Sequence, residues 1–157
     1  MNTRARVLLI ALLPLCAPVP GDAGRKVASA EIESFNRKFQ ELHLKMDNAG
    51  VLALWEEDGV ALMPGQPPLV GKPAITAWLN KVTAGTAGSK VTAEDLQFHD
   101  IIVSGDWASE WATEHQVVEQ SGKPAFEAYG KLALVLHRSP NGEWKIKQEM
   151  WNSAPRP

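Results

Sequence analysis

Apolar residues recur at intervals of three and four over residues 30–45, which is the spacing of one face of an α-helix. The members of this stripe are Ile32, Phe35, Phe39, Leu42 and Met46. A second, short helix is predicted over residues 47–55, with Asp47 as its N-cap. A third opens just before Pro73, which suits a first helical turn because its missing N–H would have no partner there. Each helix has one apolar face, so each must pack against a core.

The second half of the chain alternates between apolar and polar residues, as strands with one buried face do. The four long strands predicted there cover residues 91–103, 107–119, 126–137 and 143–152. The breaks between them contain Gly, Ser, Asn, Asp and Pro, and they are short enough to join antiparallel neighbours. Two very short strands around Pro64-Gly65 precede the third helix. Helices followed by such strands predict an α+β domain in which a curved antiparallel sheet wraps around the helices.

Strand parity predicts which side chains point toward the helices. The side chains expected inside are Phe126, Ala128, Gly130, Leu132, Leu134 and Leu136; Trp144, Ile146, Gln148, Met150 and Asn152; and Trp107, Ser109, Trp111, Thr113, His115 and Val117. Those expected on the outer face are Glu110, Glu114, Glu149, Tyr129 and Trp151. Polar groups on several inner faces indicate a shared cavity, because a buried polar group is costly unless it is paired or hydrated. The alternative is that these groups satisfy one another or lie at a wet rim.

The first residues of the chain have a different pattern from the rest. Arg4 and Arg6 precede an apolar run over residues 7–15, and small residues follow. This order is typical of a secretory signal peptide, so we expect residues 1–23 to be cleaved and the remainder to be periplasmic or secreted. A stable membrane anchor is disfavoured, because the run is shorter than the roughly 20 apolar residues of a spanning helix and contains Pro14.

The remaining domain is expected over residues 24–157, with its core over about 31–154. Its composition and charge exclude some classes of binding partner. Of the 157 residues, 45% are hydrophobic and 22% charged, and the net charge is −2. Removing the signal takes away two of the 16 basic and one of the 18 acidic side chains. A nucleic-acid partner is therefore not expected, because phosphate binding needs a clustered positive surface. The single cysteine, Cys16, leaves with the signal, and neither a metal site nor a cofactor motif is recognised.

Short landmarks follow one another in a fixed order along residues 31–154. They are Asp47 through Trp55 with Asp58, Pro64-Gly65, Gly71-Lys72-Pro73-Ala74-Ile75, Gly105-Asp106-Trp107-Ala108, Gly130-Lys131, Asn141-Gly142-Glu143-Trp144-Lys145-Ile146 and Met150-Trp151-Asn152-Ser153. With them the chain resembles the nuclear transport factor 2-like superfamily of ketosteroid isomerases and SnoaL-like polyketide cyclases, and most of all its domain of unknown function 4440 branch. The resemblance implies a cystatin-like cone with a ligand or active site in its mouth. It also implies a homodimer through the outer sheet face, for which Tyr129 and Trp151 are candidates.

The resemblance does not extend to the isomerase chemistry. Met63 stands where the ketosteroid isomerases keep their general base, and Phe39 stands where they keep an oxyanion-stabilising Tyr. Their second oxyanion donor, a protonated acid, falls near Leu132 or Ala133. None of these side chains can exchange a proton, so steroid isomerisation by that mechanism is not expected.

The candidate ligand-binding residues combine large apolar side chains with polar groups of the expected inner faces. They are Trp55, Met63, Trp78, Trp111, Thr113, His115, Gln148, Met150 and Asn152. Indole rings can wall a pocket, although plain core packing is the alternative for each of them. His115 is the candidate acid or base because an imidazole titrates near pH 6.5, and a structural or rim histidine is the alternative. The other histidines, among them His43, are expected on the surface.

Three functional hypotheses follow. The first is an exported domain that binds a small, partly apolar molecule. The second is an isomerase, dehydratase or cyclase that uses His115 with Gln148 and Asn152 as polarising donors. The third is a structural dimerisation module.

Overall fold

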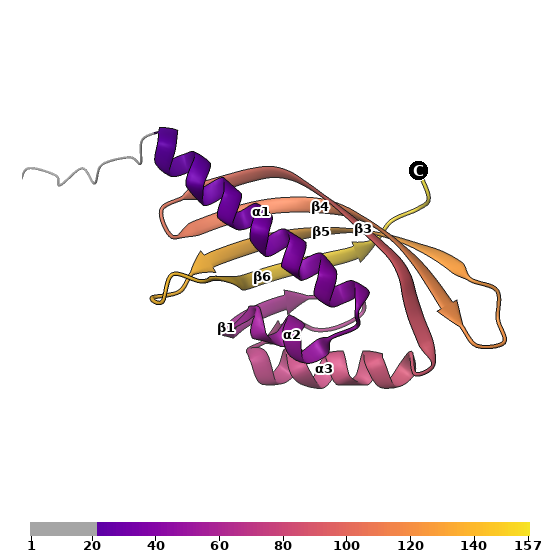
Figure 1. The fold of residues 1–157 in the computed structure, drawn as a ribbon. Coiled ribbons are helices and arrows are strands. Elements are labelled where there is room, and N and C mark those ends of the chain that lie inside the picture. Colours follow the sequence, from indigo (N-terminus) through magenta and orange to yellow (C-terminus); the bar gives the residue numbers. More distant parts are fainter. Residues whose placement is uncertain (1–21) are drawn as a thin grey trace, which may run out of the picture.

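The computed structural model describes residues 22–157 (Figure 1). The expected signal peptide, residues 1–23, lies almost wholly outside the described residues, so its cleavage stays a prediction. Among the described residues, no helix is both long and apolar enough to cross a membrane.

All of the predicted elements are present in the described part of the chain. In order they are α1 (Asp22–Leu44), α2 (Asn48–Ala53), β1 (Trp55–Leu62), β2 (Leu69–Val70), α3 (Lys72–Gly85), β3 (Ser89–Ser104), β4 (Trp107–Gln120), β5 (Phe126–Arg138) and β6 (Trp144–Ser153). Asp47 is the N-cap of α2, and its carboxylate accepts a hydrogen bond from the Gly50 N–H at 2.9 Å. The largest difference from the predicted bounds is the start of α1, which begins at Asp22 rather than at residue 30. The residues added include Ala, Arg and Lys, which are good helix formers.

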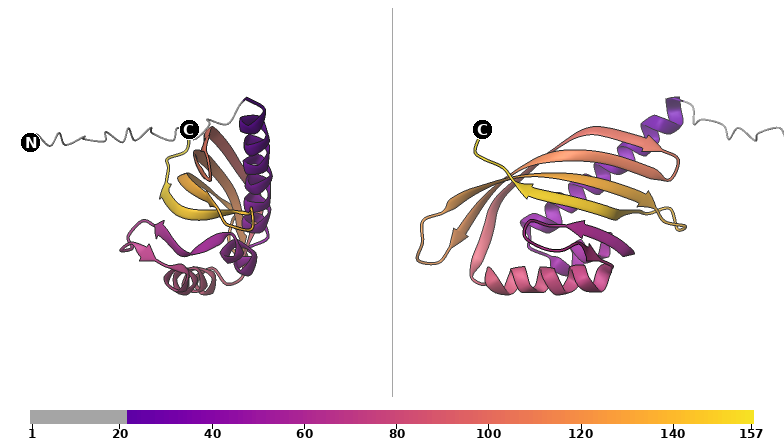
Figure 2. Two further views of the ribbon diagram at one scale, coloured as in Figure 1. Left: turned by 90° about the vertical axis from the view of Figure 1, so that its left-hand side faces the viewer. Right: turned by 180° about the vertical axis from the view of Figure 1, so that it is seen from behind.

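The strands form one curved sheet in the order β2-β1-β6-β5-β4-β3. Its long strands β3 to β6 pair antiparallel as predicted, whereas β1 pairs in parallel with β6. Helix α1 runs obliquely across the concave face, and α3 lies at the end of the sheet beside β1 (Figures 1 and 2). The predicted α+β fold, a curved sheet around helices, is confirmed.

The core lies between α1 and the concave face of the sheet. Its most completely buried side chains come from the helix and from the two central strands: Phe39, Ile32, Leu134, Leu136 and Ile146. Each such side chain contributes about 1.5–3 kcal/mol to folding. The helical stripe and the β5 parity read from the sequence are therefore correct.

Strand β4 has the opposite parity from the one predicted. Ala108, Glu110 and Ala112 are buried beneath α1, whereas Trp107 and Trp111 are exposed on the outer face. The reason is steric: alanine side chains fit in the space beneath α1, whereas two indole rings in their place would not. The amide of buried Asn36 on α1 reaches down to this face and donates a hydrogen bond to the Glu110 Oε2 atom at 2.7 Å.

Strand β6 changes parity partway along its length. Its register against β5 shifts by one residue at Lys147, since Val135 pairs with Gln148 but Leu136 pairs with Ile146. Such a bulge adds one unpaired residue, and the side chains beyond it exchange faces. As a result Glu149 is buried inside, and the outward side chains beyond the bulge are Gln148, Met150 and Asn152, contrary to the prediction.

The burial of Glu110 predicts a pH-dependent cost of folding. Burial raises the pKa of this carboxyl to about 7, although the Asn36 amide opposes the rise. The folded state therefore favours the neutral carboxyl, so its stability is full below pH 4.5 and falls as the pH rises through about 7. Glu110→Gln keeps an amide oxygen for Asn36 and removes the ionisation. At pH 8 we expect its free energy of unfolding to exceed that of the wild type by about 3 kcal/mol.

Urea denaturation at pH 8 and pH 5 measures this difference, which should shrink toward zero at pH 5. Glu119→Gln, at an exposed position of the same strand, is the control and should show no gain. A Glu110→Gln protein that is no more stable than the wild type at pH 8 would contradict the assignment.

Candidate functional site

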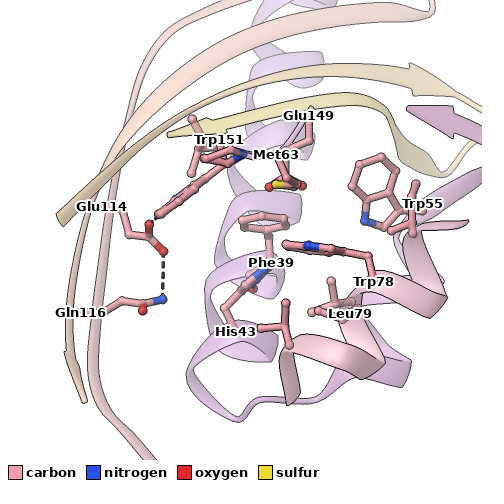
Figure 3. A pocket seen from close by; sticks show the side chains of 15 residues that line it. Phe39, His43, Trp55, Met63, Trp78, Leu79, Glu114, Gln116, Glu149 and Trp151 are labelled. Atoms are coloured by element: carbon pink, nitrogen blue, oxygen red, sulfur yellow. Dashed lines mark hydrogen bonds between the residues drawn. The ribbon is translucent and has the colours of Figure 1, made fainter. Parts of the chain in front are cut away.

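A cavity of about 390 Å³ opens between the concave face of the sheet, α1 and α3 (Figure 3). Most of its wall is aromatic or aliphatic, and these side chains include Phe39, Val51, Trp55, Met63, Ile75, Trp78, Leu79, Leu132 and Trp151. Its polar side chains are His43, Glu114, Gln116 and Glu149. The cavity is thus an apolar chamber with its polar groups supplied by the sheet and by α1.

Three of the residues predicted to bind ligand line this cavity. Trp55 opens β1 and is buried, Met63 follows the end of β1, and Trp78 projects from the middle of α3. Trp55 and Met63 stand at the two ends of β1, and α3, which carries Trp78, packs against that strand. Their role in binding stays a prediction.

The predicted residues of β4 lie on the outer face instead. Trp111 is 43% exposed, stacks on His99 at 4.2 Å between ring centroids and donates a hydrogen bond from Nε1 to Asp100 at 2.7 Å. Thr113 is exposed on the same face. His115 stacks on Tyr129 at 4.6 Å. The expectation that Trp111, Thr113 and His115 face the cavity is wrong, as it is for Gln148, Met150 and Asn152 beyond the β6 bulge.

The sheet contributes to the cavity two carboxyl groups, of Glu114 and Glu149, that were expected on its outer face. Glu114 of β4 accepts a hydrogen bond from the Trp151 indole N–H at 2.6 Å and another from the Gln116 amide at 2.9 Å. The bond from Trp151 crosses over β5 at Gly130, the residue paired with Glu114. A side chain at Gly130 would occupy the path of this bond, so the glycine is what lets β4 and β6 be joined across β5.

Glu149 is the most isolated polar group of the wall. Its side chain is 8% exposed, and no hydrogen bond to it is formed by any described residue. Burial, and then the negative charge of Glu114, raises the pKa of Glu149 to about 7. A carboxyl with this pKa is divided between its neutral and ionised forms at physiological pH.

Glu94 of β3 is another inward carboxyl, and it lies beside Glu114 and Gln116. It pairs in register with Gln116, and both of its carboxyl oxygens are buried without a hydrogen-bond partner among the described residues. Burial and repulsion from Glu114 raise the pKa of Glu94 to about 8. The inner face of β3, β4 and β6 therefore carries a field that opposes further negative charge.

His43 lines the cavity from the last turn of α1, although it was expected on the surface. Its Nδ1 lies 2.9 Å from the backbone carbonyl oxygen of Phe39, and its ring packs on the Phe39 ring at 4.1 Å. Since a carbonyl oxygen only accepts, Nδ1 carries the proton of the neutral ring and Nε2 keeps its lone pair. Burial lowers the pKa of His43. The spacing of four residues from Phe39, on one helix face, was the signal that could have placed it.

The three positions at which the resemblance predicts isomerase catalytic groups meet in this cavity. Phe39, Met63 and Leu132 all line its wall, whereas Ala133 points to the outer face. All three wall positions are apolar here, so any proton transfer in the cavity has to use other groups.

The two residues predicted at a dimer face lie on opposite sides of the sheet. Tyr129 is on the outer face with His115, but Trp151 points into the cavity because it follows the β6 bulge. Dimerisation itself stays a prediction. Among residues 22–157, no group of three or more His, Cys, Asp and Glu side chains could hold a metal ion.

Comparison with known proteins identifies the fold of this site. The model of the SnoaL-like domain matches residues 32–155. No curated protein matches the chain. Solved structures match at 14–22% identity, which shows the fold alone.

Three of these structures illustrate the likeness. A ketosteroid isomerase-like protein from Erwinia carotovora atroseptica has a TM-score of 0.70 and 19% identity, with 81% of this chain and 96% of that chain covered. A conserved protein from Planctomyces limnophilus has a TM-score of 0.70 and 22% identity, covering 83% and 100%. A candidate dehydratase of the nuclear transport factor 2-like family from Streptomyces avermitilis has a TM-score of 0.67 and 18% identity, covering 83% and 99%.

The hydrogen bond from Trp151 to Glu114 passes over Gly130, so adding a methyl group at Gly130 should weaken it. A Cβ there would lie 2.3 Å from the Glu114 Oε2 and 2.7 Å from the Trp151 Nε1, so Gly130→Ala must separate the two side chains. We expect a loss of about 1–3 kcal/mol in the free energy of unfolding, together with a shift in tryptophan fluorescence. Gly85→Ala is the control, because a Cβ at Gly85 meets nothing within 4 Å. Equal stability and equal spectra in both variants would show that the bond does not hold the strands together.

Proposed function

The chain belongs to the SnoaL-like domain family of the nuclear transport factor 2-like superfamily, and on this basis we propose that it is an exported domain that binds a small, largely apolar molecule in the cavity. One observation carries the proposal: a chamber of about 390 Å³ has aromatic walls and a buried carboxyl, Glu149, with no partner among the described residues. Small-molecule sites are concave, mainly apolar and furnished with a few polar groups. Assignment to the domain of unknown function 4440 branch stays a prediction.

The wall suits a ligand with a flat or bulky apolar body. Trp78 and Leu79 of α3 face Phe39 of α1 across the chamber, with Trp55 at one side (Figure 3). Rigid indole and phenyl rings bury large areas at little cost in side-chain entropy. Affinity would come from this apolar contact, and orientation from the polar groups.

Glu149 is the polar group best placed to orient the ligand. Both oxygens of Glu114 already accept hydrogen bonds, from Trp151 and Gln116. Glu149 receives no hydrogen bond from any described residue, and it lines the cavity. A ligand with a matching polar group would therefore find an unoccupied partner in this carboxyl.

The proposal predicts opposite results for two identical substitutions. In a thermal-shift screen of metabolites, Trp78→Ala should weaken the affinity for each hit by about tenfold or more, because it removes an aromatic wall that a ligand would contact. Trp111→Ala removes the same side chain from the outer face and should leave those affinities unchanged. Isothermal titration of the hits checks this, after the unliganded variants have been shown to unfold cooperatively. Hits that are lost with Trp111 and kept without Trp78 would place the binding site elsewhere.

A second candidate function, an isomerase, dehydratase or cyclase, is favoured by one observation. His43 has a lone pair on Nε2 and Glu149 is part neutral near pH 7, and both line the same cavity. In such an enzyme His43 would take a proton from the substrate and Glu149 would donate one, since efficient acids and bases titrate near the working pH. His43 thus replaces His115 in the catalytic hypothesis.

The enzyme hypothesis predicts a bell-shaped dependence of rate on pH. Activity should rise as His43 loses its proton, below the usual imidazole pKa, and fall as Glu149 ionises near pH 7. His43→Gln should reduce turnover at least a hundredfold, whereas His115→Gln, on the outer face, should leave it intact. Conversion of screening hits, followed by mass spectrometry between pH 5 and pH 9, measures both. Turnover that survives His43→Gln would remove this residue from the mechanism.

A further inference from the structure

We propose that the cavity recognises an organic cation, an ammonium group carried on an apolar or aromatic body. The inference rests on the proposed function and names the chemical class of its ligand. Three independent features support it: the charges of the lining, the unpartnered state of Glu149 and the aromatic character of the walls.

The ionisable side chains of the lining include acids but no permanent cation. Glu114 and Glu149 are acidic, and no Lys or Arg occurs among the residues that line the cavity. His43 is neutral near pH 7, since its pKa is lowered by burial. A ligand with a carboxylate or phosphate would therefore be repelled by the lining and would find no positive partner there. A positively charged ligand would be attracted.

Glu149 lacks the partner that such a ligand would supply. Its side chain is more than nine-tenths buried, lines the cavity and receives no hydrogen bond from any described residue. Figure 3 shows it reaching the cavity from β6 close to Met63. Buried carboxylates are ordinarily paired with a cation or with several donors. An ammonium group at this end of the chamber would complete the pairing.

The aromatic walls are the other half of a cation site. Phe39, Trp55, Trp78 and Trp151 line the same chamber as the two carboxyls. The face of an aromatic ring attracts a nearby cation, Trp most strongly, and the attraction grows when water is excluded. Rings and carboxylates together therefore favour a desolvated ammonium over a neutral group of equal shape.

The proposal also sets a direction for the pH dependence of binding. The titratable groups that face Glu149 are Glu114 and His43, which line the same cavity, and Glu110, which pairs with the same residue of β5, Leu134. Glu94 of β3 lies farther off, beside Glu114 and Gln116. The described residues of α3, β1 and β5 that line the cavity are not titratable. A cation binds the ionised form of Glu149, so its affinity rises as the pH increases from 6 to 8 and a proton is released on binding. A ligand that needs the neutral carboxyl as a donor would show the opposite trend.

The test compares two probes of the same shape. Phenyltrimethylammonium carries a charge that does not depend on pH, and tert-butylbenzene has carbon in place of its nitrogen. Tryptophan fluorescence titrations at constant ionic strength measure the affinity of each at pH 6 and pH 8. At pH 8 we expect the cation to bind at least tenfold more tightly than the neutral probe. Its affinity should fall by up to about tenfold at pH 6, while that of tert-butylbenzene stays constant.

Two conservative variants assign the effect to the carboxyls. Glu149→Gln and Glu114→Gln should each reduce the preference for the cation, and Glu149→Gln should also abolish its dependence on pH. Glu127→Gln, which alters an exposed carboxylate of the outer face, is the matched control and should change neither. Thermal unfolding confirms that each variant is folded. Glu149→Gln is expected to retain the fold, because it removes an ionisable group from a buried position.

The possible outcomes distinguish a failure of the cation site from a failure of the proposed binding function. Equal affinities for the two probes, or a preference for the cation that both glutamine variants retain, would overturn the inference and leave the binding function standing. If neither probe binds at either pH, both the cation site and the proposed binding function are wrong for ligands of this size.

Discussion

The packing of α1 over the concave face of the sheet is the constraint on which the rest of the structure depends. Ala108 and Ala112 are small enough to lie beneath the helix, and buried Asn36 donates a hydrogen bond to Glu110 at 2.7 Å. Because side chains alternate along a strand, fixing Ala112 inside also turns Glu114 inward and sends Trp111 outward. The fit of small side chains beneath the helix therefore determines that β4 presents Glu114, and not Trp111, to the chamber.

The inner face of the sheet is acidic as well as apolar. Glu94, Glu110 and Glu149 are all buried, and burial raises the pKa of each. Buried carboxyls make the folded state less stable above neutral pH, so their clustering on the inner face of the sheet is a cost that packing alone does not require. Carboxyls that line the chamber could pair with a positively charged ligand, or donate a proton in a reaction that needs an acid.

Residues of the candidate site could be predicted from the sequence only where their placement did not depend on which face of a long strand is buried. Trp55, Met63 and Trp78 lie at a strand start, a strand end and a helix stripe, and all three line the cavity. His115 and the other predicted residues of β4 and β6 lie outside. Hydrophobicity favoured the indoles of β4 as the buried set, and steric fit against α1 reversed the choice. In β6 the bulge at Lys147, invisible in the alternating pattern, exchanged the faces.

By itself the sequence determined the elements, their order and the class of fold, because helical stripes, strand alternation and turn residues are local properties of the chain. It also determined that the isomerase positions Phe39, Met63 and Leu132 are apolar. Only the tertiary structure decided which face of β4 meets the helix and where β6 slips in register. The face of β4 and the register of β6 bring Glu114, Glu149 and Trp151 into the chamber that His43 of α1 also lines. They depend on the fit between side chains far apart in the sequence, and no local pattern records that fit.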